Sequence, residues 1–360
     1  MVRSGPLPYP AGWMHAFVMQ YQVLPPFIFG FLLTVFPRWM GLPELSRWHY
    51  VPVGLGLLGG QLLCLAGLAG SPSLVQAGAM LSLMGWLAAW AFLVRLIWQE
   101  GAKTWHAISC AAALLMGAVG LVLFNVYLHG GDARLLFASI KFGSFGLLLP
   151  IYVTVAHRMF PFFAGNVVIG YRVWRPLTWL GVFWVLAIAH LGLELAHGYA
   201  WLWLADVPLL GIGVLWAWKT WPRGPAPALL RVLFLGYAWL PVAFALFVIQ
   251  SLWYAIGGDF ILGRAPAHAL FIGFFGSLLV AMVTRVTQGH SGRPLELGTV
   301  AGIAFVAVQG VAVIRIAAEL LPDGPLWQAA AGIGWIAAFL PWVFRSAWIY
   351  LTPRADGRAG

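Results

Sequence analysis

The sequence predicts an all-α fold, a polytopic bundle of about eleven transmembrane helices, and three observations support this. Hydrophobic residues make up 62% of the 360-residue chain and charged residues only 8%, whereas soluble domains carry about 25% charged residues. Apolar stretches of about 20 residues, the length that crosses a bilayer, recur from one end of the chain to the other. No long polar stretch interrupts them, so we expect a single membrane domain over residues 1–350 and a short cytoplasmic tail at 351–360.

Short segments rich in Gly and Pro separate the expected spans. We place the spans at 12–36, 51–70, 73–97, 104–129, 133–157, 176–197, 199–220, 228–256, 266–287, 297–320 and 325–350. Because proline lacks an N–H and collides with the preceding helical turn, Pro25-Pro26 should kink or break the first span and Pro150 the fifth. Gly56 and Gly60 form a small-xxx-small pair in the second span, a pattern typical of close helix packing.

The basic residues divide unevenly between the two sides of the predicted bundle. The side that holds the C-terminus and the loops after odd-numbered spans has fifteen Lys and Arg residues: Arg38, Arg47, Arg95, Lys103, Arg158, Arg172, Arg175, Lys219, Arg223, Arg231, Arg285, Arg293, Arg345, Arg354 and Arg358. The other side has five: Arg3, Arg134, Lys141, Arg264 and Arg315. Because Lys and Arg concentrate in cytoplasmic loops, we expect the N-terminus outside and the C-terminus in the cytoplasm. The net charge of +10 then reflects topology rather than nucleic-acid binding.

Most ionisable residues inside the predicted spans lie near the outer side. They are His15, His129, Lys141, His190, Glu194, His197, Asp206, His268, Arg315 and Glu319. A charge in hydrocarbon costs roughly 3 kcal/mol even on lenient scales, so such residues usually face a bundle interior or a cavity. Lys141 and Arg315 could instead extend to the interface, an alternative that suits the short side chains of Asp206 and Glu194 less well.

The sixth predicted span carries a polar stripe. His190, Glu194 and His197 are spaced i, i+4 and i+7, which places all three on one helical face. Neutral imidazole is the commonest transition-metal ligand, and a carboxylate can orient it. The stripe therefore fits a metal site, and it fits equally a hydrogen-bonded contact between helices.

Three single histidines, His15, His129 and His268, lie at a similar depth on the first, fourth and ninth predicted spans. Inward-facing histidines on different helices are how bundles hold haem or metal, whereas a lone histidine at a helix end is often interfacial. Arg315 and Lys141, near the same level, could pair with anionic groups, haem propionates included.

Several stretches resemble the NnrS family of haem- and copper-containing membrane proteins. They are GFLLTVFPRWMG (30–41), HRMFPFFAGNVV (157–168), the Asn125-x-x-x-His129 pair and, most distinctively, HALFIGFFGSLLVAMVTRVTQGHSGRPLEL (268–297). The resemblance implies a multi-pass protein of the bacterial inner membrane that carries haem, expected to be b-type, and copper as a second cofactor. It implies a role in nitric oxide metabolism, protecting the cell during denitrification and nitrosative stress by binding or reducing nitric oxide near the outer face.

The chain also departs from the family pattern. The first conserved span of the family usually reads His-Ala-His-Glu-Met, and here it reads His15-Ala16-Phe17-Val18-Met19. If the missing His-Glu pair serves a second metal or a proton path in the family, this chain has lost that site or has relocated it to the His190, Glu194 and His197 stripe. The family positions make His15, His129 and His268 the expected axial haem ligands. His290, in the Gly-His-Ser-Gly-Arg-Pro turn, is either a ligand on the cytoplasmic side or part of a structural loop.

The residues leave open whether nitric oxide is bound, sensed or turned over by a haem-dependent oxidoreductase. Reduction would need electrons, and the chain has no Cys-x-x-Cys-His motif and no flavin or nucleotide fingerprint. Quinol or a redox protein would then be the electron donor.

One alternative function is a secondary transporter or other proton-coupled protein that uses Lys141, Asp206 and Glu194, although these charges lie near one interface and no internal repeat is visible. Another is a structural subunit with an interfacial polar cluster.

Overall fold

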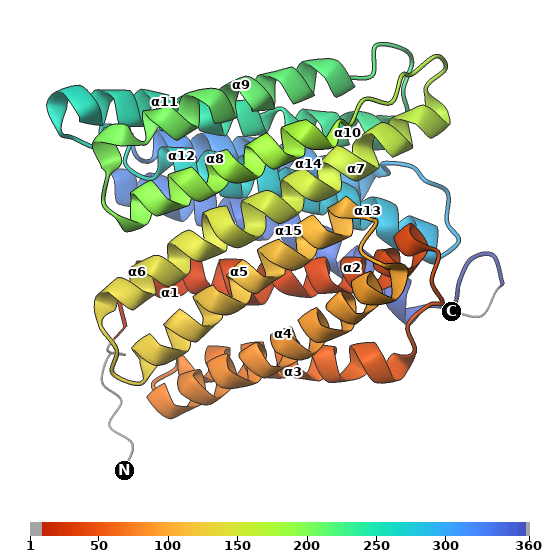
Figure 1. Ribbon diagram of the computed structural model, residues 1–360, viewed down its shortest axis with the longest axis horizontal. Helices are drawn as coiled ribbons and strands as arrows, with labels where there is room; N and C mark the ends of the chain where they lie inside the picture. The colour runs from red at the N-terminus through yellow and green to blue at the C-terminus, as the bar shows by residue number, and fades with distance from the viewer. Residues whose placement is uncertain (1–8, 358–360) are drawn as a thin grey trace. The chain divides into compact units, whose positions relative to one another are not determined.

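The computed structural model describes residues 9–357, and over this range the chain forms helices and connecting loops with no strand (Figure 1). Ten helical segments among the described residues are long and apolar enough to cross a membrane. The predicted class, an all-α multi-pass membrane protein, is therefore confirmed. The seventh predicted span corresponds to α9 (Trp203–Thr220), which is not among the ten and carries both Asp206 and Lys219.

The contacts divide the chain into two compact units, Met1–Val155 and Ala156–Gly360, and the division falls inside α7 (Leu149–Val167). The first unit contains α1 (Ala11–Phe17), η1 (Val18–Val23), α2 (Leu24–Met40), α3 (Arg47–Gly67), α4 (Pro72–Glu100), α5 (Trp105–Leu128), α6 (Ala133–Lys141) and η2 (Phe142–Leu148). Within it α4 packs on α2, α3 and α5, and α5 packs on α6 and η2. Fully buried aromatic side chains such as Phe17, Tyr21, Trp86 and Phe124 fill the spaces between these helices.

The backbones of α3 and α4 lie in close contact. A Cβ atom added at Gly56 would lie 2.5 Å from the Cα of Gly85, and one added at Gly60 would lie 2.6 Å from the carbonyl oxygen of Gly78. Only glycine lets two backbones approach so closely. The packing role predicted for Gly56 and Gly60 is confirmed.

Two segments of the first unit are π-helical, with hydrogen bonds from residue i to residue i+5. Segment η1 comes directly before Leu24-Pro25-Pro26, and η2 comes directly before Leu149-Pro150. Proline leaves a carbonyl of the preceding turn without its usual donor and presses against it, and the wider π turn accommodates both effects. The predicted interruptions at Pro25-Pro26 and Pro150 are therefore confirmed, and each takes the form of a π-helical segment.

The second unit contains α8 (Leu177–Leu195), η3 (Tyr199–Trp201), α9, α10 (Ala228–Tyr237), α11 (Trp239–Gly257), α12 (Ala265–His268), η4 (Ala269–Gly276), α13 (Ser277–His290), α14 (Thr299–Ala317) and α15 (Gly324–Leu351). Here α9 packs on α8 and α11, η4 packs on α11 and α14, and α14 packs on α15.

The eighth predicted span is interrupted at Ala238 because Pro241, in the first turn of α11, supplies no N–H to the preceding turn. Segment η4 is a third π-helix, and no proline follows it closely.

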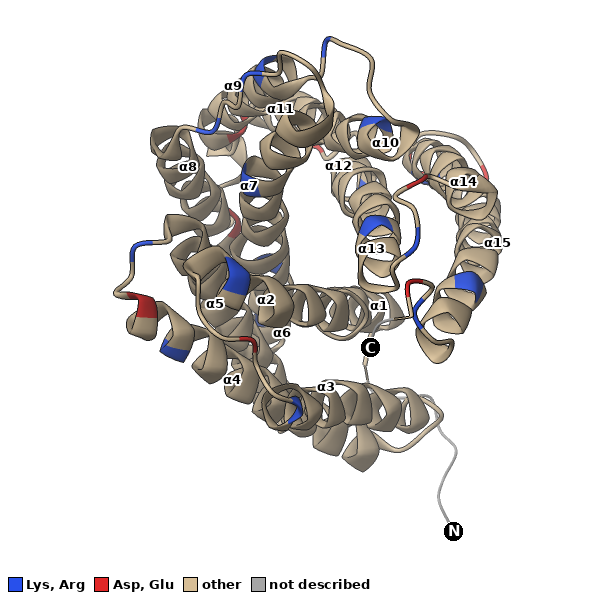
Figure 2. Cartoon of the chain, turned by 90° about the vertical axis from the view of Figure 1, so that its right-hand side faces the viewer, with Lys and Arg blue, Asp and Glu red and all other residues tan. Residues whose placement is uncertain are grey.

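The orientation in the membrane remains a prediction, which reporter fusions test. Figure 2 looks onto one end of the helices, where Lys and Arg lie in loops and at the ends of α10, α13 and α15. Arg3 and Arg358, which contribute to the predicted charge bias, lie outside the described residues.

We expect a green fluorescent protein inserted in the loop at 168–176 to fluoresce, since that loop should be cytoplasmic. An alkaline phosphatase inserted at 129–132 should be active outside, and the reverse pattern would overturn the topology.

Candidate functional site

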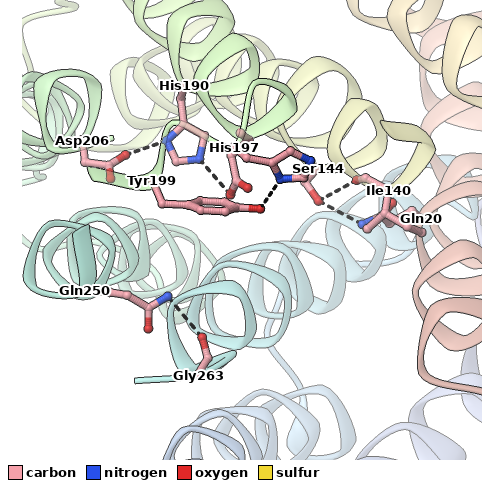
Figure 3. A network of polar contacts seen from close by, with 10 residues as sticks. Gln20, Ile140, Ser144, His190, His197, Tyr199, Asp206, Gln250 and Gly263 are labelled. Atoms are coloured by element: carbon pink, nitrogen blue, oxygen red, sulfur yellow. Dashed lines mark hydrogen bonds and ion pairs between the residues drawn. The ribbon is translucent and has the colours of Figure 1, made fainter. Parts of the chain in front are cut away.

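Three ionisable side chains meet inside the second unit. His190 and Asp206 are fully buried, and Glu194 is 5% exposed. The His190 Nδ1 atom lies 2.6 Å from Asp206 Oδ1 (Figure 3). The His190 Nε2 atom lies 3.6 Å from Glu194 Oε1. His190 and Glu194 stand one turn apart on α8, and Asp206 comes from the first turn of α9. The ring of Phe247, on α11, packs edge-on against the imidazole at 5.5 Å.

His197 does not share the helical face of the other two. Helix α8 ends at Leu195, and His197 adopts a left-handed backbone with φ of +55° in the following turn. The predicted three-residue stripe is therefore wrong for His197, because the i+7 spacing loses its meaning once the helix has ended. His197 is exposed, and its Nδ1 atom lies 2.8 Å from the Tyr199 hydroxyl. Burial, reinforced by the nearby Glu194 carboxylate and by Tyr254, raises the pKa of Tyr199.

The described side chains around His190 do not make up a three-ligand metal group. Within residues 9–357, no group of three or more His, Cys, Asp or Glu side chains is arranged to hold a metal ion. Both ring nitrogens of His190 face carboxylates, Asp206 at Nδ1 and Glu194 at Nε2. A metal ligand would direct a nitrogen lone pair at the ion and use only the other nitrogen for orientation.

The two histidines predicted in the first unit come from adjacent segments. His15 lies on α1, and His129 is the residue that ends α5. The ring of Phe17, on α1, stacks on that of Phe124, on α5, with centroids 3.5 Å apart. Both histidines are exposed. The Nδ1 atom of His129 lies 2.8 Å from the carbonyl oxygen of Asn125, one turn earlier.

His268 has the same local geometry in the second unit. It is the half-buried last residue of α12, and its Nδ1 atom lies 2.9 Å from the carbonyl oxygen of Arg264. A carbonyl can only accept, so Nδ1 carries the proton and Nε2 carries the lone pair. This tautomer and this type of hydrogen bond are those of metal-ligating histidines. His129 and His268 are thus prepared for coordination through Nε2.

Arg315, predicted as an anion partner, already has one in Glu319. Its Nη1 atom lies 2.6 Å from Glu319 Oε1. The other carboxylate oxygen, Oε2, accepts a hydrogen bond from the backbone N–H of Arg264 at 3.2 Å, directly before the helix that carries His268. Burial alone would raise the pKa of Glu319, but the hydrogen bonds from Arg315 and Arg264 lower it. Lys141, the half-buried end of α6, places its Nζ atom 5.3 Å from the ring centre of Phe137.

The turn that contains His290 is held by the C-terminal tail. The Arg354 guanidinium donates to the His290 carbonyl oxygen at 2.7 Å. Gly292 has a φ of +66°, a backbone conformation that favours glycine, and the Asp356 carboxyl group lies next to it. These are the contacts of a structural loop, and the ligand role of His290 stays a prediction.

The family model described as NnrS protein matches residues 2–354, nearly the whole chain. The chain belongs to the NnrS family. No curated protein and no solved structure matches it. The resemblance recognised at 30–41, 157–168 and 268–297 is confirmed, and His268 and His290 both lie in the most distinctive of these stretches.

Three predicted site residues of this NnrS-family chain come just before the three π-helical segments. Lys141 directly precedes η2, His268 directly precedes η4, and His15 stands three residues before Val18, the start of η1. Such segments are rare and appear frequently at functional sites, because they widen the helix and redirect side chains. Their positions therefore agree with the residues selected from the sequence.

Two contacts of the NnrS-family chain could not be read from spacing. Asp206 follows His190 by 16 residues on another helix, and Tyr199 hydrogen-bonds to His197 across a turn. The sequence offers one signal for the contact between His190 and Asp206. Asp206 lies near the start of the seventh predicted span, at the same expected depth in the membrane as His190 near the end of the sixth. The sequence suggests Asp206 only as a charge for transport, and the structure pairs it with His190.

Proposed function

We propose that this NnrS-family protein binds haem, of b-type, in the bacterial inner membrane and acts on nitric oxide near the outer face. The observation that carries the proposal is the hydrogen bond from Nδ1 to a backbone carbonyl in both His129 and His268. It fixes Nε2 as the coordinating nitrogen before any iron arrives. Family membership supports the same conclusion. The haem iron, when bound, supplies the site at which the gas coordinates.

The candidate ligands are His15 and His129 within the first unit and, considered separately, His268 within the second unit. Glu319 would hold the turn that carries His268 in place through Arg264. Arg315 donates one of its five N–H groups to Glu319, so it keeps donors for a propionate. Lys141 is the corresponding cation in the first unit. Nitric oxide reduction consumes protons and electrons, and we propose quinol or a redox protein as the electron donor.

Copper, implied by the family resemblance, has no ligand set that we propose in the described residues. The best predicted set, His190, Glu194 and His197, is divided by the end of α8, because His197 lies in the left-handed turn that follows it. A second candidate function is a proton-coupled membrane protein without haem. The buried His190, Glu194 and Asp206 cluster is the observation that favours it.

An absorption spectrum of the purified full-length protein tests the proposal. We expect a Soret band and narrow bands on reduction that shift when nitric oxide is added. His129→Ala and His268→Ala should lose most of the haem or change its spectrum, because each removes a prepared Nε2 ligand. His49→Ala is the matched control, since His49 is half-buried like His268 but its Nδ1 atom bonds to the Ser46 hydroxyl and not to a backbone carbonyl.

A colourless, folded protein would overturn the proposal in favour of the proton-coupled alternative. Full haem content with unchanged spectra in the Ala variants of His15, His129 and His268 would overturn the ligand assignment while leaving haem binding in place. Pyridine haemochrome assays give the haem content in both cases.

A further inference from the structure

Segment η4 differs from the other π-helical segments of the described chain because no following proline explains it. Segments η1 and η2 stand directly before Leu24-Pro25-Pro26 and Leu149-Pro150, whereas η4 continues into Ser277 and the rest of α13. His268, a candidate ligand, is the residue directly before η4. Since π-helical turns are rare and this one has no proline behind it, its contacts with neighbouring helices are the remaining candidates for its cause.

The indole ring of Trp239 lies directly against the backbone of η4. A Cβ atom added at Gly273, inside η4, would lie 2.4 Å from Cδ2 and 2.5 Å from Cε3 of that ring. Trp239 is the first residue of α11 and follows the helix interruption at Ala238. The ring can occupy this place only because residue 273 has no side chain.

Gln309, on α14, holds the indole in this position. Trp239 Nε1 donates a hydrogen bond to Gln309 Oε1 at 2.6 Å. Gln309 Nε2 donates to Ser277 Oγ at 2.7 Å and to the carbonyl oxygen of Phe305 at 3.0 Å. The amide oxygen and both amide protons are therefore used, which fixes one orientation of the side chain. A polar group in a helix apolar enough to cross a membrane is costly unless it is bonded in this way.

These hydrogen bonds connect the middle and the end of η4 to two other helices. The indole covers Gly273, and the fully buried Ser277 is the first residue after the segment. On the other side of η4, the Glu319 carboxylate accepts a hydrogen bond from the backbone N–H of Arg264, four residues before His268. An ordinary contact between helices would need the hydrogen bonds of Gln309 but not a ring placed on the backbone of η4.

We propose that Trp239, Gln309 and Ser277 form a clamp that imposes the π-helical geometry of η4, and that Gln309 is thereby a positioning residue for His268. Each hydrogen bond of a π-helix spans one residue more than in an α-helix. If η4 became α-helical, the direction of His268 relative to α13 would change by about 100°, the rotation of one helical residue. The importance of that direction rests on the proposed function, in which His268 is a ligand, whereas the clamp itself does not depend on haem.

Hydrogen–deuterium exchange of the full-length protein in lipid nanodiscs, followed by mass spectrometry, tests the clamp. We expect Gln309→Leu to speed exchange at 265–280 by about fivefold or more, the effect of one lost hydrogen bond on a local opening. Trp239→Phe keeps an aromatic ring but removes the indole N–H, and it should act in the same way. The double variant should be no worse than Gln309→Leu alone, because both changes break the same hydrogen bond.

The matched control for the exchange experiment is Gln61→Leu. Gln61 is also half-buried in a helix apolar enough to cross a membrane, but it lies on α3 of the first unit. The same substitution there should leave exchange at 265–280 at the wild-type rate.

Solid-state NMR of the protein labelled with nitrogen-15 histidine tests the positioning of His268. Its ring signals are identified by their loss in His268→Gln. They should shift in Gln309→Leu, and also in Gly273→Ala, because the added Cβ atom displaces the indole from η4. They should stay in place in Gln61→Leu.

Wild-type exchange at 265–280 in both Gln309→Leu and Trp239→Phe would overturn the clamp. Faster exchange with unchanged His268 signals would overturn the positioning role of Gln309. Trp239→Phe is the milder change, so it remains decisive if Gln309→Leu fails to fold. Neither measurement needs haem, so a colourless protein would overturn the proposed function and leave both of these tests decisive.

Discussion

Asp206→Ala is expected to lower the free energy of unfolding by about 3–5 kcal/mol, the usual cost of breaking a buried ion pair from one side. The variant removes the acceptor of the His190 Nδ1–H bond at a place where both side chains are fully buried. Water cannot replace the lost oxygen without entering a space that the Phe247 ring borders. Unfolding of the purified protein in mixed micelles, followed by circular dichroism as SDS is added, measures the change.

Two further variants isolate the cause. Replacing both partners, His190→Leu with Asp206→Leu, should restore most of the lost stability, because apolar groups of similar volume need no hydrogen bonds. Asp259→Ala removes an exposed carboxylate from the loop after α11 and should change stability by no more than about 0.5 kcal/mol. If Asp206→Ala is as stable as Asp259→Ala, the buried pair does not stabilise the fold.

The fold class could be predicted because it depends on summed properties of long segments. Apolar length identifies a membrane helix whatever its neighbours are, and the predicted spans fall on helices of the structure. Proline disrupts a helix whatever its neighbours are, so the sequence also predicts the interruptions at Pro25-Pro26 and Pro150. The interruption at η4 has no proline to announce it. Segment η4 packs on α11 and α14, and these contacts cannot be read from the sequence alone.

The candidate site was predictable residue by residue but not as contacts. Depth along each span selected His190, Glu194 and Asp206, all of which are buried together. Helical periodicity then failed at His197, because the end of α8 depends on a left-handed turn that no spacing rule marks. The hydrogen bonds that set the tautomers of His129 and His268 are local to one turn. Each bond joins a histidine ring to the backbone carbonyl oxygen four residues earlier, near a helix end. The rotamer of the histidine side chain decides whether the bond forms.

Gly56→Ala and Gly54→Ala should have opposite effects, although the two glycines are two residues apart on α3. Around a Cβ atom at Gly54 no other atom lies within 4 Å. Alanine there removes the backbone entropy of glycine and should stabilise the helix by up to about 1 kcal/mol. A Cβ atom at Gly56 would lie 2.5 Å from Gly85 Cα and 2.9 Å from Gly85 N. These are backbone atoms, so only a displacement of the whole helix α4 relieves the collision.

The expected cost of Gly56→Ala is about 1–3 kcal/mol, the range for overpacking a close contact. SDS unfolding should therefore separate the two variants by about 1–4 kcal/mol, with Gly54→Ala above the wild type and Gly56→Ala below it. Gly85→Ala tests the same contact from the other helix, since its Cβ atom would lie 2.8 Å from Gly56 Cα, and it should resemble Gly56→Ala. Equal stabilities for Gly54→Ala and Gly56→Ala would mean that α3 and α4 are not in backbone contact. In that case the packing inferred from the Gly56 and Gly60 pair would be wrong.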